Sequence, residues 1–458
     1  MLISPASLTT LKGKLKNTVL LGNEPTPELA AIMLVYFVQG ILGLARLAIS
    51  FFLKDELGLS PAETAALVGV VVLPWTLKPL IGFTSDGLPV LGYHRRPYLI
   101  LAGLIGSVSW LAFGTIVNTP LAATITITFT SLSVAMSDVI VDSIVAQRAR
   151  TQSQSAVGSL QSLCWGSSAI GGIITAYLGG ILLEYLSTRT IFLITAIFPL
   201  IVVAVAGLID EEKTDEGSSW ETVRQQIKLL RQAITQKAIL LPTLFILIWQ
   251  ATPSADSAFF YFTTNELGFQ PEFLGRVRLV TSVAALFGVW LFQRYFKSVP
   301  FRRIFFWSTL VSTGLGLTTL LLVTHTNRAL GIDDHWFSLG DSVILTVAGE
   351  MTLMPLLVLA AKLCPPGVEA TLFALVMSVF NLGGLISHEL GAILTHLFGV
   401  TETQFDNLWL LMLITNLSTL LALPLVRWLP NTSADAEDIP PATGETTQLK
   451  RVPEFAAE

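Results

Sequence analysis

The stretch DELGLSP at residues 55–61 returns as NELGFQP at residues 265–271, and this repeat decides the fold. Each copy follows a long apolar segment, and Asp55 and Asn265 are separated by an offset of 210 residues. At the same offset Arg46 aligns with Asp256, so each apolar segment carries a charge at the matching position. The repeat predicts two halves that descend from one ancestral unit.

The composition places the chain in a lipid bilayer. Of the 458 residues, 52% are hydrophobic and 13% are charged, against roughly 25% charged residues in a soluble domain. The net charge of -5, without a basic stripe, excludes a nucleic-acid partner. Cys164 and Cys364 have no CxxC or histidine-rich neighbourhood, so we expect no disulfide framework, no metal site and no cofactor.

Twelve apolar segments approach the roughly 20 residues that a helix needs to cross a membrane. Their expected windows are 30–53, 61–82, 96–117, 121–146, 156–183, 190–209, 238–263, 273–295, 302–323, 341–363, 369–397 and 407–428. They predict an all-α membrane protein with six-helix bundles at residues 30–209 and 238–428. Residues 1–29 are expected to be a cytosolic arm, residues 210–237 a cytosolic linker with an amphipathic helix, and residues 429–458 a disordered cytosolic tail.

The positions of lysine and arginine predict the orientation in the membrane. If the N-terminus is cytoplasmic, the outer side holds only Lys54, Arg189, Arg276, Arg278 and Arg328. Two more basic residues fall within spans, and all others lie on the cytoplasmic side. The positive-inside rule therefore places both termini in the cytoplasm. We expect a multi-pass protein of the plasma membrane, or of the plastid envelope if the chain comes from a plant.

A second offset, of 212 residues, strengthens the repeat. It aligns Asp138 with Glu350, and three glycines with three others: Gly171 with Gly383, Gly172 with Gly384 and Gly179 with Gly391. Parallel halves related by an axis along the membrane normal are typical of transporters with a substrate site at the midplane. A solute carrier is the function that this organisation favours.

The first span carries polar groups on one face. Tyr36, Gln39 and Arg46 fall at helical spacing, which points them in the same direction. A charge within a span is costly in lipid and is a candidate for function by default. Arg46 is expected either to face the substrate or to pair with an acid such as Asp256 or Asp138.

The fourth span places Asp138 and Asp142 four residues apart, on one face of a helix. Two like charges so close in a low dielectric cannot both ionise cheaply, unless Arg46 or Lys78 neutralises one of them. Asp138 is a candidate for substrate binding and for proton coupling. Asp142 is a candidate for proton coupling or, because it lies near Arg148, for a salt bridge that gates the cytoplasmic side.

The seventh span reads WQATPSADSAFFYF, and Pro253 interrupts its backbone hydrogen bonds. An interrupted helix is tolerated in a membrane only beside protein or a wet cavity. Polar candidates for substrate binding cluster at this interruption: Gln250, Ser254, Asp256 and Tyr261.

Two further spans contribute candidates. Glu350 in the tenth span matches Asp138 and is a candidate for substrate binding and proton coupling, or a structural acid held by hydrogen bonds. Gln161 and Trp165 share a face of the fifth span, and Trp165 offers a surface for stacking a flat ring. Most small residues of the fifth span are expected only to allow close packing.

The loop GFTSDGLPVLGYHRR at residues 82–96 resembles the loop signature of the major facilitator superfamily. In that signature an aspartate and an arginine latch the two halves on the cytoplasmic side. Asp86, Arg95 and Arg96 are the corresponding candidates here, although the arginine pair comes several residues late. Lys78 and Arg148 are further candidates for the gate.

Three blocks carry a more specific resemblance: VYFVQGILGLARLAISFFLKDELGLSPAE at 35–63, PWTLKPLIGFTSDGLPVLGYHRRPYL at 74–99 and SDVIVDSIVAQRAR at 137–150. The chain resembles the folate-biopterin transporter family of the major facilitator superfamily, especially its cyanobacterial and plastid carriers. The resemblance implies symport of folates or pterins with protons through a central cavity. It supports the residues that match the family blocks: Gln39, Arg46, Lys78, Asp86, Arg95, Asp138, Asp142 and Arg148.

The chemistry of such substrates suits these residues. A pterin ring presents donors that one carboxylate can accept, and the glutamate tail of a folate matches the fork of an arginine. We expect a carboxylate to hold the ring, Arg46 the tail and an aromatic side chain the flat face. The candidates for ring and face are Asp138, Asp256, Glu350, Tyr36 and Trp165.

Other functions stay open at this point. A pigment-delivery factor of the same fold would co-purify with pigment, and a carrier for another small organic anion would not respond to pterins. A membrane enzyme is not expected, because HExxH, GxSxG and paired metal-ligand motifs are missing from the sequence. The expected partners are a small molecule, protons and lipid, with the protein as a monomer.

Overall fold

The computed structural model describes residues 20–151, 154–213, 224, 228, 231–232, 234–363 and 369–433. The predictions for most of the arm, most of the linker and the tail after residue 433 lie outside these residues, as does Cys364. The side chain of Arg148 is likewise outside what is described. In the described part all named elements are helices, so the predicted all-α class is confirmed.

The helices follow one another with short connections. The first half contains α2 (Pro27–Ile41), η2 (Leu42–Leu44), α3 (Ala45–Phe51), η3 (Phe52–Glu56), α4 (Pro61–Val71), α5 (Leu73–Thr76), α6 (Lys78–Gly87), α7 (Arg96–Thr115), α8 (Pro120–Thr151), α9 (Gln154–Tyr185), α10 (Thr188–Thr195), α11 (Phe198–Val205) and η4 (Ala206–Leu208). The second half contains α13 (Lys237–Gln250), α14 (Asp256–Tyr261), η5 (Phe262–Glu266), α15 (Pro271–Leu291), η6 (Phe292–Phe296), α16 (Phe301–Gly316), α17 (Thr319–Val323), α18 (Thr326–Ala329), α19 (Asp334–Lys362), α20 (Glu369–Leu397), α21 (Leu408–Ser418) and η7 (Thr419–Trp428). Consecutive pieces join into 11 helices that, among the described residues, are long and apolar enough to cross a membrane.

The seventh predicted span is discontinuous, as Pro253 predicts. It is divided into α13 and α14, with residues 251–255 between them. The freed backbone groups find partners on α20, where the Ser387 carbonyl accepts from the Ser254 amide at 3.2 Å and the Ser387 hydroxyl donates to the Thr252 carbonyl at 2.5 Å. A neighbouring helix therefore replaces the missing hydrogen bonds, which is what allows such a break at membrane depth.

The repeated stretch adopts the same conformation in both copies. A π-helical turn ends within the first two residues of each copy, η3 in the first half and η5 in the second. A glycine follows in the left-handed region, Gly58 with φ of 64° and Gly268 with φ of 69°. The next long helix then starts with proline at Pro61 or Pro271. The internal repeat inferred from the sequence is thus confirmed at the level of backbone geometry.

The aligned glycines pack in equivalent places. A Cβ on Gly179 would lie 3.0 Å from the carbonyl oxygen of Leu44, and a Cβ on Gly391 would collide with the carbonyl oxygen of Ser254. Ser254 is the counterpart of Leu44, since 44 plus 210 is 254. The fifth and eleventh spans therefore approach the first and seventh spans closely, which leaves little room for a side chain at Gly179 and none at Gly391.

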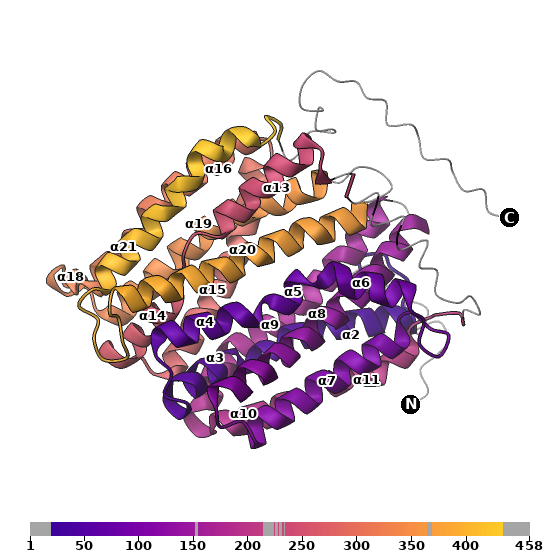
Figure 1. Ribbon diagram of the computed structural model, residues 1–458, viewed down its shortest axis with the longest axis horizontal. Coiled ribbons are helices and arrows are strands. Elements are labelled where there is room, and N and C mark those ends of the chain that lie inside the picture. Colours follow the sequence, from indigo (N-terminus) through magenta and orange to yellow (C-terminus); the bar gives the residue numbers. More distant parts are fainter. Residues whose placement is uncertain are drawn as a thin grey trace, which may run out of the picture.

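The helices lie side by side in two groups, coloured indigo to magenta and rose to yellow in Figure 1. Buried apolar clusters lie within each group, and the groups meet where α15 packs on α9 and α20 packs on α4. Hydrogen bonds join the groups at the predicted outer face, the end with residues 57–60 and 267–270. They run from Lys54 to Asn265 (2.9 Å), from Tyr261 to the Leu59 carbonyl (2.5 Å) and from Tyr177 to Glu272 (3.2 Å).

Candidate functional site

Lys78 and Asp138 form an ion pair in the membrane-spanning part of the first half. Their side chains are only 15% and 13% exposed, so the pair is largely removed from water. The Lys78 ammonium also lies 4.4 Å from the centroid of the Trp75 ring, which adds a cation–π contact. Of the two cations that the sequence offered for neutralising the fourth-span acids, Lys78 is the one that contacts Asp138.

Asp142 lies one turn from Asp138 and accepts a hydrogen bond from the hydroxyl of Tyr36. Its side chain is exposed, yet Tyr36 of α2, Lys78 of α6 and Asp138 all act on its charge. A carboxylate surrounded in this way faces the interior of the bundle. Contact with neighbouring helices is what is expected for a charge that lies at membrane depth.

The second half repeats the frame of this cluster but not its cation. Glu350 is the counterpart of Asp138, and the counterpart of Lys78 is Gly288, since 78 plus 210 is 288. A Cβ on Gly288 would lie 2.7 Å from the Cβ of Glu350, so the acid packs directly on the glycine. Glu350 is half-buried and forms no ion pair with any described residue.

Arg46 is exposed at the start of α3, and no described residue forms an ion pair with its guanidinium. Neither of the two acids considered as its structural partner fills that role here. Asp138 is paired with Lys78, and Asp256 is exposed at the first position of α14, where its amide donates to the Ser254 hydroxyl at 3.1 Å. Arg46 is therefore available to a ligand.

The remaining substrate candidates of the first half lie in different surroundings. Gln39 is half-buried, and its side-chain nitrogen has no hydrogen-bond partner among the described residues. Gln161 and Trp165 are both exposed along one face of α9, with Trp165 at 63%. The geometry is compatible with stacking a flat ligand on Trp165.

The remaining candidates of the second half are more enclosed. Gln250 packs on Gly383, whose Cβ would lie 2.7 Å from the Cβ of Gln250. Tyr261 is fully buried, and its hydroxyl bonds to the Leu59 carbonyl and, at 2.9 Å, to the Thr64 hydroxyl of the first half. In this conformation Tyr261 joins the two halves rather than lining an open space.

The loop at the predicted cytoplasmic face brings Asp86 and Arg95 together at 2.6 Å. Arg95 is 8% exposed and also donates to the Ser85 hydroxyl at 3.3 Å. Arg96 points elsewhere, because its guanidinium donates to the Ile209 carbonyl at 2.9 and 2.6 Å. Of the gate candidates in the loop, Asp86 and Arg95 are the pair that the structure joins, while Lys78 lies in the membrane interior.

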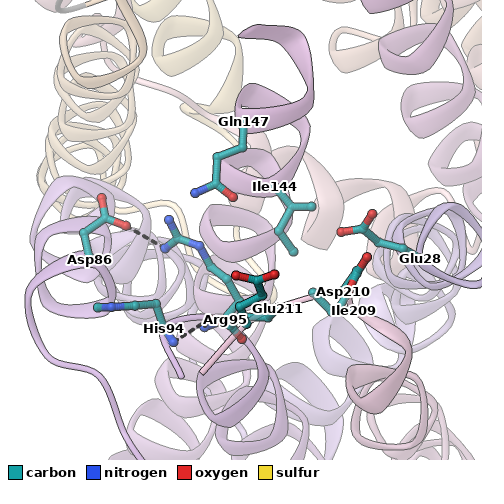
Figure 2. Close-up of a pocket in the computed structure, with 10 residues that line it drawn as sticks. Glu28, Asp86, His94, Arg95, Ile144, Gln147, Ile209, Asp210 and Glu211 are labelled. Atoms are coloured by element: carbon teal, nitrogen blue, oxygen red, sulfur yellow. Dashed lines mark hydrogen bonds and ion pairs between the residues drawn. The ribbon is translucent and has the colours of Figure 1, made fainter. Parts of the chain in front are cut away.

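A pocket of about 410 Å³ adjoins this ion pair at the predicted cytoplasmic face. Figure 2 shows Arg95 reaching Asp86 on its wall, with Glu211 alongside. Glu211 accepts from the amides of His94, Arg95 and Arg96 at 2.5, 2.9 and 3.0 Å. These amides precede and open α7, so Glu211 satisfies donors that a helix start leaves free. This role of Glu211 was not predicted from the sequence, although acids directly after the sixth span were its signal.

Arg278 is a second residue that the sequence analysis missed. It was counted with the outer loops, but it lies in the second turn of α15 and is half-buried. Its guanidinium forms no ion pair with any described residue, and the charge of Arg46 acts on it. The signal was available, because Arg278 falls inside the predicted eighth window.

Comparisons with known proteins identify the family of the chain. The model of the BT1 family matches residues 39–447. The folate-biopterin transporter of Synechocystis sp. is 63% identical over 430 residues, which cover 94% of this chain and 87% of that protein. The probable folate-biopterin transporter 2 of Arabidopsis thaliana is 35% identical over 396 residues, covering 84% and 79%.

Solved structures extend the comparison to the fold. The nucleoside transporter NupG superposes with a TM-score of 0.65 at 14% identity, covering 87% of this chain and 98% of that one. A D-xylose-proton symporter gives a TM-score of 0.65 at 13% identity, covering 89% and 100%. At such low identity the likeness shows the fold alone, which is the predicted fold of major facilitator transporters.

Proposed function

The chain belongs to the BT1 family, and we propose that it is a secondary carrier that moves folates and related pterins across a membrane. The observation that carries the proposal is the group of charged and polar side chains held inside the spans of the first half: Tyr36, Lys78, Asp138 and Asp142. Charges at this depth are costly in lipid and are kept where they face a pathway for solute or protons.

Transport in this proposal proceeds by alternating access. Residues 30–209 and 238–428 move as two bundles, with residues 1–29 as the cytosolic arm, 210–237 as the linker and 429–458 as the tail. The hydrogen bonds of Tyr261 and Tyr177 across the predicted outer face support a conformation closed on that side. The contact between α9 and α15 must loosen there for the opposite state to form.

Substrate recognition in this proposal divides between the two parts of a folate. A carboxylate of Asp138, Asp256 or Glu350 accepts hydrogen bonds from the pterin ring. Arg46 binds the tail, and Trp165 or Tyr36 contacts the flat face of the ring. The polar side chains of Gln39, Gln161, Gln250 and Ser254 complete the binding region.

Proton coupling in this proposal involves Asp138, Asp142 and Glu350. Protonation of Asp138 removes the charge that holds Lys78, so the ion pair opens when a proton binds. Glu350 faces Gly288 where Asp138 faces Lys78, so the second half lacks this internal counter-ion. Asp86 and Arg95 latch the predicted cytoplasmic side, with Arg96, Arg148 and Lys78 as further gate residues.

The protein in this proposal is a monomer of the plasma membrane with both termini in the cytoplasm. The excess of lysine and arginine on that side supports the orientation. A tag at either terminus should therefore be protected from protease added outside intact cells, and cleavage there would contradict it.

The proposal is tested by uptake of labelled folate in cells that neither make nor import folate. Wild-type protein should restore uptake, and the rate should rise when the outside is more acidic than the cytoplasm and fall with a protonophore. Arg46→Ala and Asp138→Asn should abolish most uptake at equal membrane expression, whereas Asp406→Asn, in an exposed loop, should not. Normal uptake by the first two variants would overturn the residue assignment, and no uptake by the wild type would overturn the substrate.

A further inference from the structure

Arg46 and Arg278 lie inside spans, and their guanidinium groups make no hydrogen bond or ion pair with the described residues. Arg46 belongs to the first span and Arg278 to the eighth, so the two come from different halves. Placing a charge at membrane depth without a partner is costly. Two such charges in one place indicate a site that an anion completes.

The packing of α9 brings the two arginine-bearing turns together. Gly43 rests on α9, where its Cβ would lie 3.0 Å from the Thr175 hydroxyl oxygen. Gly275 rests on the next turns of the same helix, where its Cβ would lie 2.9 Å from the Cα of Gly180. Each arginine follows its glycine by three residues, which keeps it on a similar side of its helix. Both guanidinium groups therefore project beside the same stretch of α9.

The two arginines also lie at nearly the same depth. The first span runs toward the predicted outer face, so Arg46 is one turn outward of Gly43, and the eighth span runs away from it, so Arg278 is one turn inward of Gly275. At about 1.5 Å per residue, each shift is about 4.5 Å, against about 7.5 Å between Thr175 and Gly180. The levels then differ by only about 1.5 Å, in agreement with the charge of Arg46 acting on Arg278.

Nearby acids are engaged elsewhere or remain apart. Glu272 of α15 bonds to Arg276 at 2.5 Å and to the Tyr177 hydroxyl at 3.2 Å. Asp138 is held by Lys78. The described residues therefore provide no ion pair that neutralises Arg46 or Arg278.

We propose that Arg46 and Arg278 form one binding site for a dicarboxylate, and that they hold the two carboxylates of the glutamate tail of a folate. This proposal rests on the proposed function and narrows its substrate class to doubly charged folates. Each planar guanidinium can bind one carboxylate through two parallel hydrogen bonds. A ligand with a single carboxylate would leave one of the two cations uncompensated, so the site selects against pterins that lack the tail.

The test compares two ligands of purified protein by calorimetry or ligand-induced thermal shift: folate, and pteroate, which has the same ring system but lacks the glutamate. Wild-type protein should prefer folate by about 10- to 100-fold, the range expected for one charge-assisted bidentate contact. Pteroate carries one carboxylate, on its benzoate ring, and folate carries two. Arg278→Gln and Arg46→Gln should therefore each remove most of this preference, by weakening the binding of folate more than that of pteroate. Arg278→Lys keeps the charge without the fork and should retain an intermediate preference.

Arg276→Gln is the matched control, because it removes the same charge two residues away from Arg278. The Arg276 side chain is 61% exposed and is already paired with Glu272. This variant should keep the wild-type preference. The dicarboxylate site would be overturned if Arg278→Gln kept the wild-type preference for folate, or if it lost affinity for folate and pteroate equally. Failure of the wild type to bind folate would instead overturn the proposed function, so the two ideas fail separately.

Discussion

A methyl group added to Gly275 should open the predicted outer face. Gly275 of α15 and Gly180 of α9 meet where the two halves are closed on each other. A Cβ on Gly275 would lie 2.9 Å from the Cα of Gly180 and 3.1 Å from the carbonyl oxygen of Tyr177. Both are backbone atoms, so no rotation of a side chain can relieve the overlap.

The size of the effect follows from these distances. Ordinary van der Waals contact begins at 3.4 Å, whereas the added Cβ would lie 2.9 Å from the Gly180 Cα. The helices α9 and α15 must therefore separate by at least the difference of 0.5 Å. Overpacking of this kind costs about 1–3 kcal/mol. The cost falls on the outer-closed state alone, because the contact is absent when the halves part. The ratio of outer-closed to outer-open protein should therefore fall by about 5- to 150-fold.

Pulsed electron spin resonance measures this shift as a distance between two labels at the predicted outer face. Tyr185 at the end of α9 and Trp336 near the start of α19 are 79% and 73% exposed, which suits them for labelling as cysteines. The native thiols are removed by Cys164→Ser and Cys364→Ser. Gly275→Ala should increase the population with the longer distance.

Gly166→Ala is the control for this experiment, because a Cβ on Gly166 of the same helix α9 would meet nothing within 4 Å. Its distance distribution should match the wild type. Identical distributions for Gly275→Ala and the wild type would refute the reasoning, since the contact would then contribute nothing to outer closure.

Three further changes probe the charged groups. Lys78→Met should destabilise the protein by about 3–5 kcal/mol, because it leaves Asp138 unpaired. The double variant with Asp138→Asn should recover most of the lost thermal unfolding temperature, and no recovery would contradict a direct ion pair between the two side chains. Tyr36→Phe removes the donor to Asp142 and should cost about 1.5–3 kcal/mol, with an unchanged midpoint as the contrary result. Glu211→Gln should weaken the start of α7 by about 0.5–2 kcal/mol, seen as faster hydrogen exchange at its three partner amides.

The fold was predictable because its signals are local and repeated. The apolar windows, the two copies around Asp55 and Asn265, and Pro253 each act within one segment. Among the described residues 11 helices are long and apolar enough to span a membrane, and the seventh window is divided between α13 and α14 beside Pro253. Ion pairs between segments that are far apart in the sequence were harder to predict. Asp138 had two cations to choose from, and only the approach of α6 to α8 decides for Lys78.

Arg278 shows why the candidate site was incomplete. Arg276 and Arg278 end a polar stretch, and basic residues two apart at the end of an apolar window are typical of a loop. In a helix, however, two residues two apart point about 200° away from each other. Arg276 therefore reaches Glu272 and water, whereas Arg278 turns toward the interior. The start of α15 at Pro271 places both arginines within the helix, in agreement with the predicted eighth window.

The two halves differ in function because some aligned positions of the repeat carry different residues. The repeat places the same backbone frame in each half, shown by η3 and η5 and by the matching contacts of Gly179 and Gly391. Within that frame the first half has an ion pair where the second has an acid on a glycine. A lysine introduced at Gly288 would give the second half the cation that Lys78 provides in the first half. Because Glu350 already fills that space, Gly288→Lys should instead separate α15 from α19 and lower the uptake of folate. Uptake at the wild-type rate would show that transport does not depend on this difference between the halves.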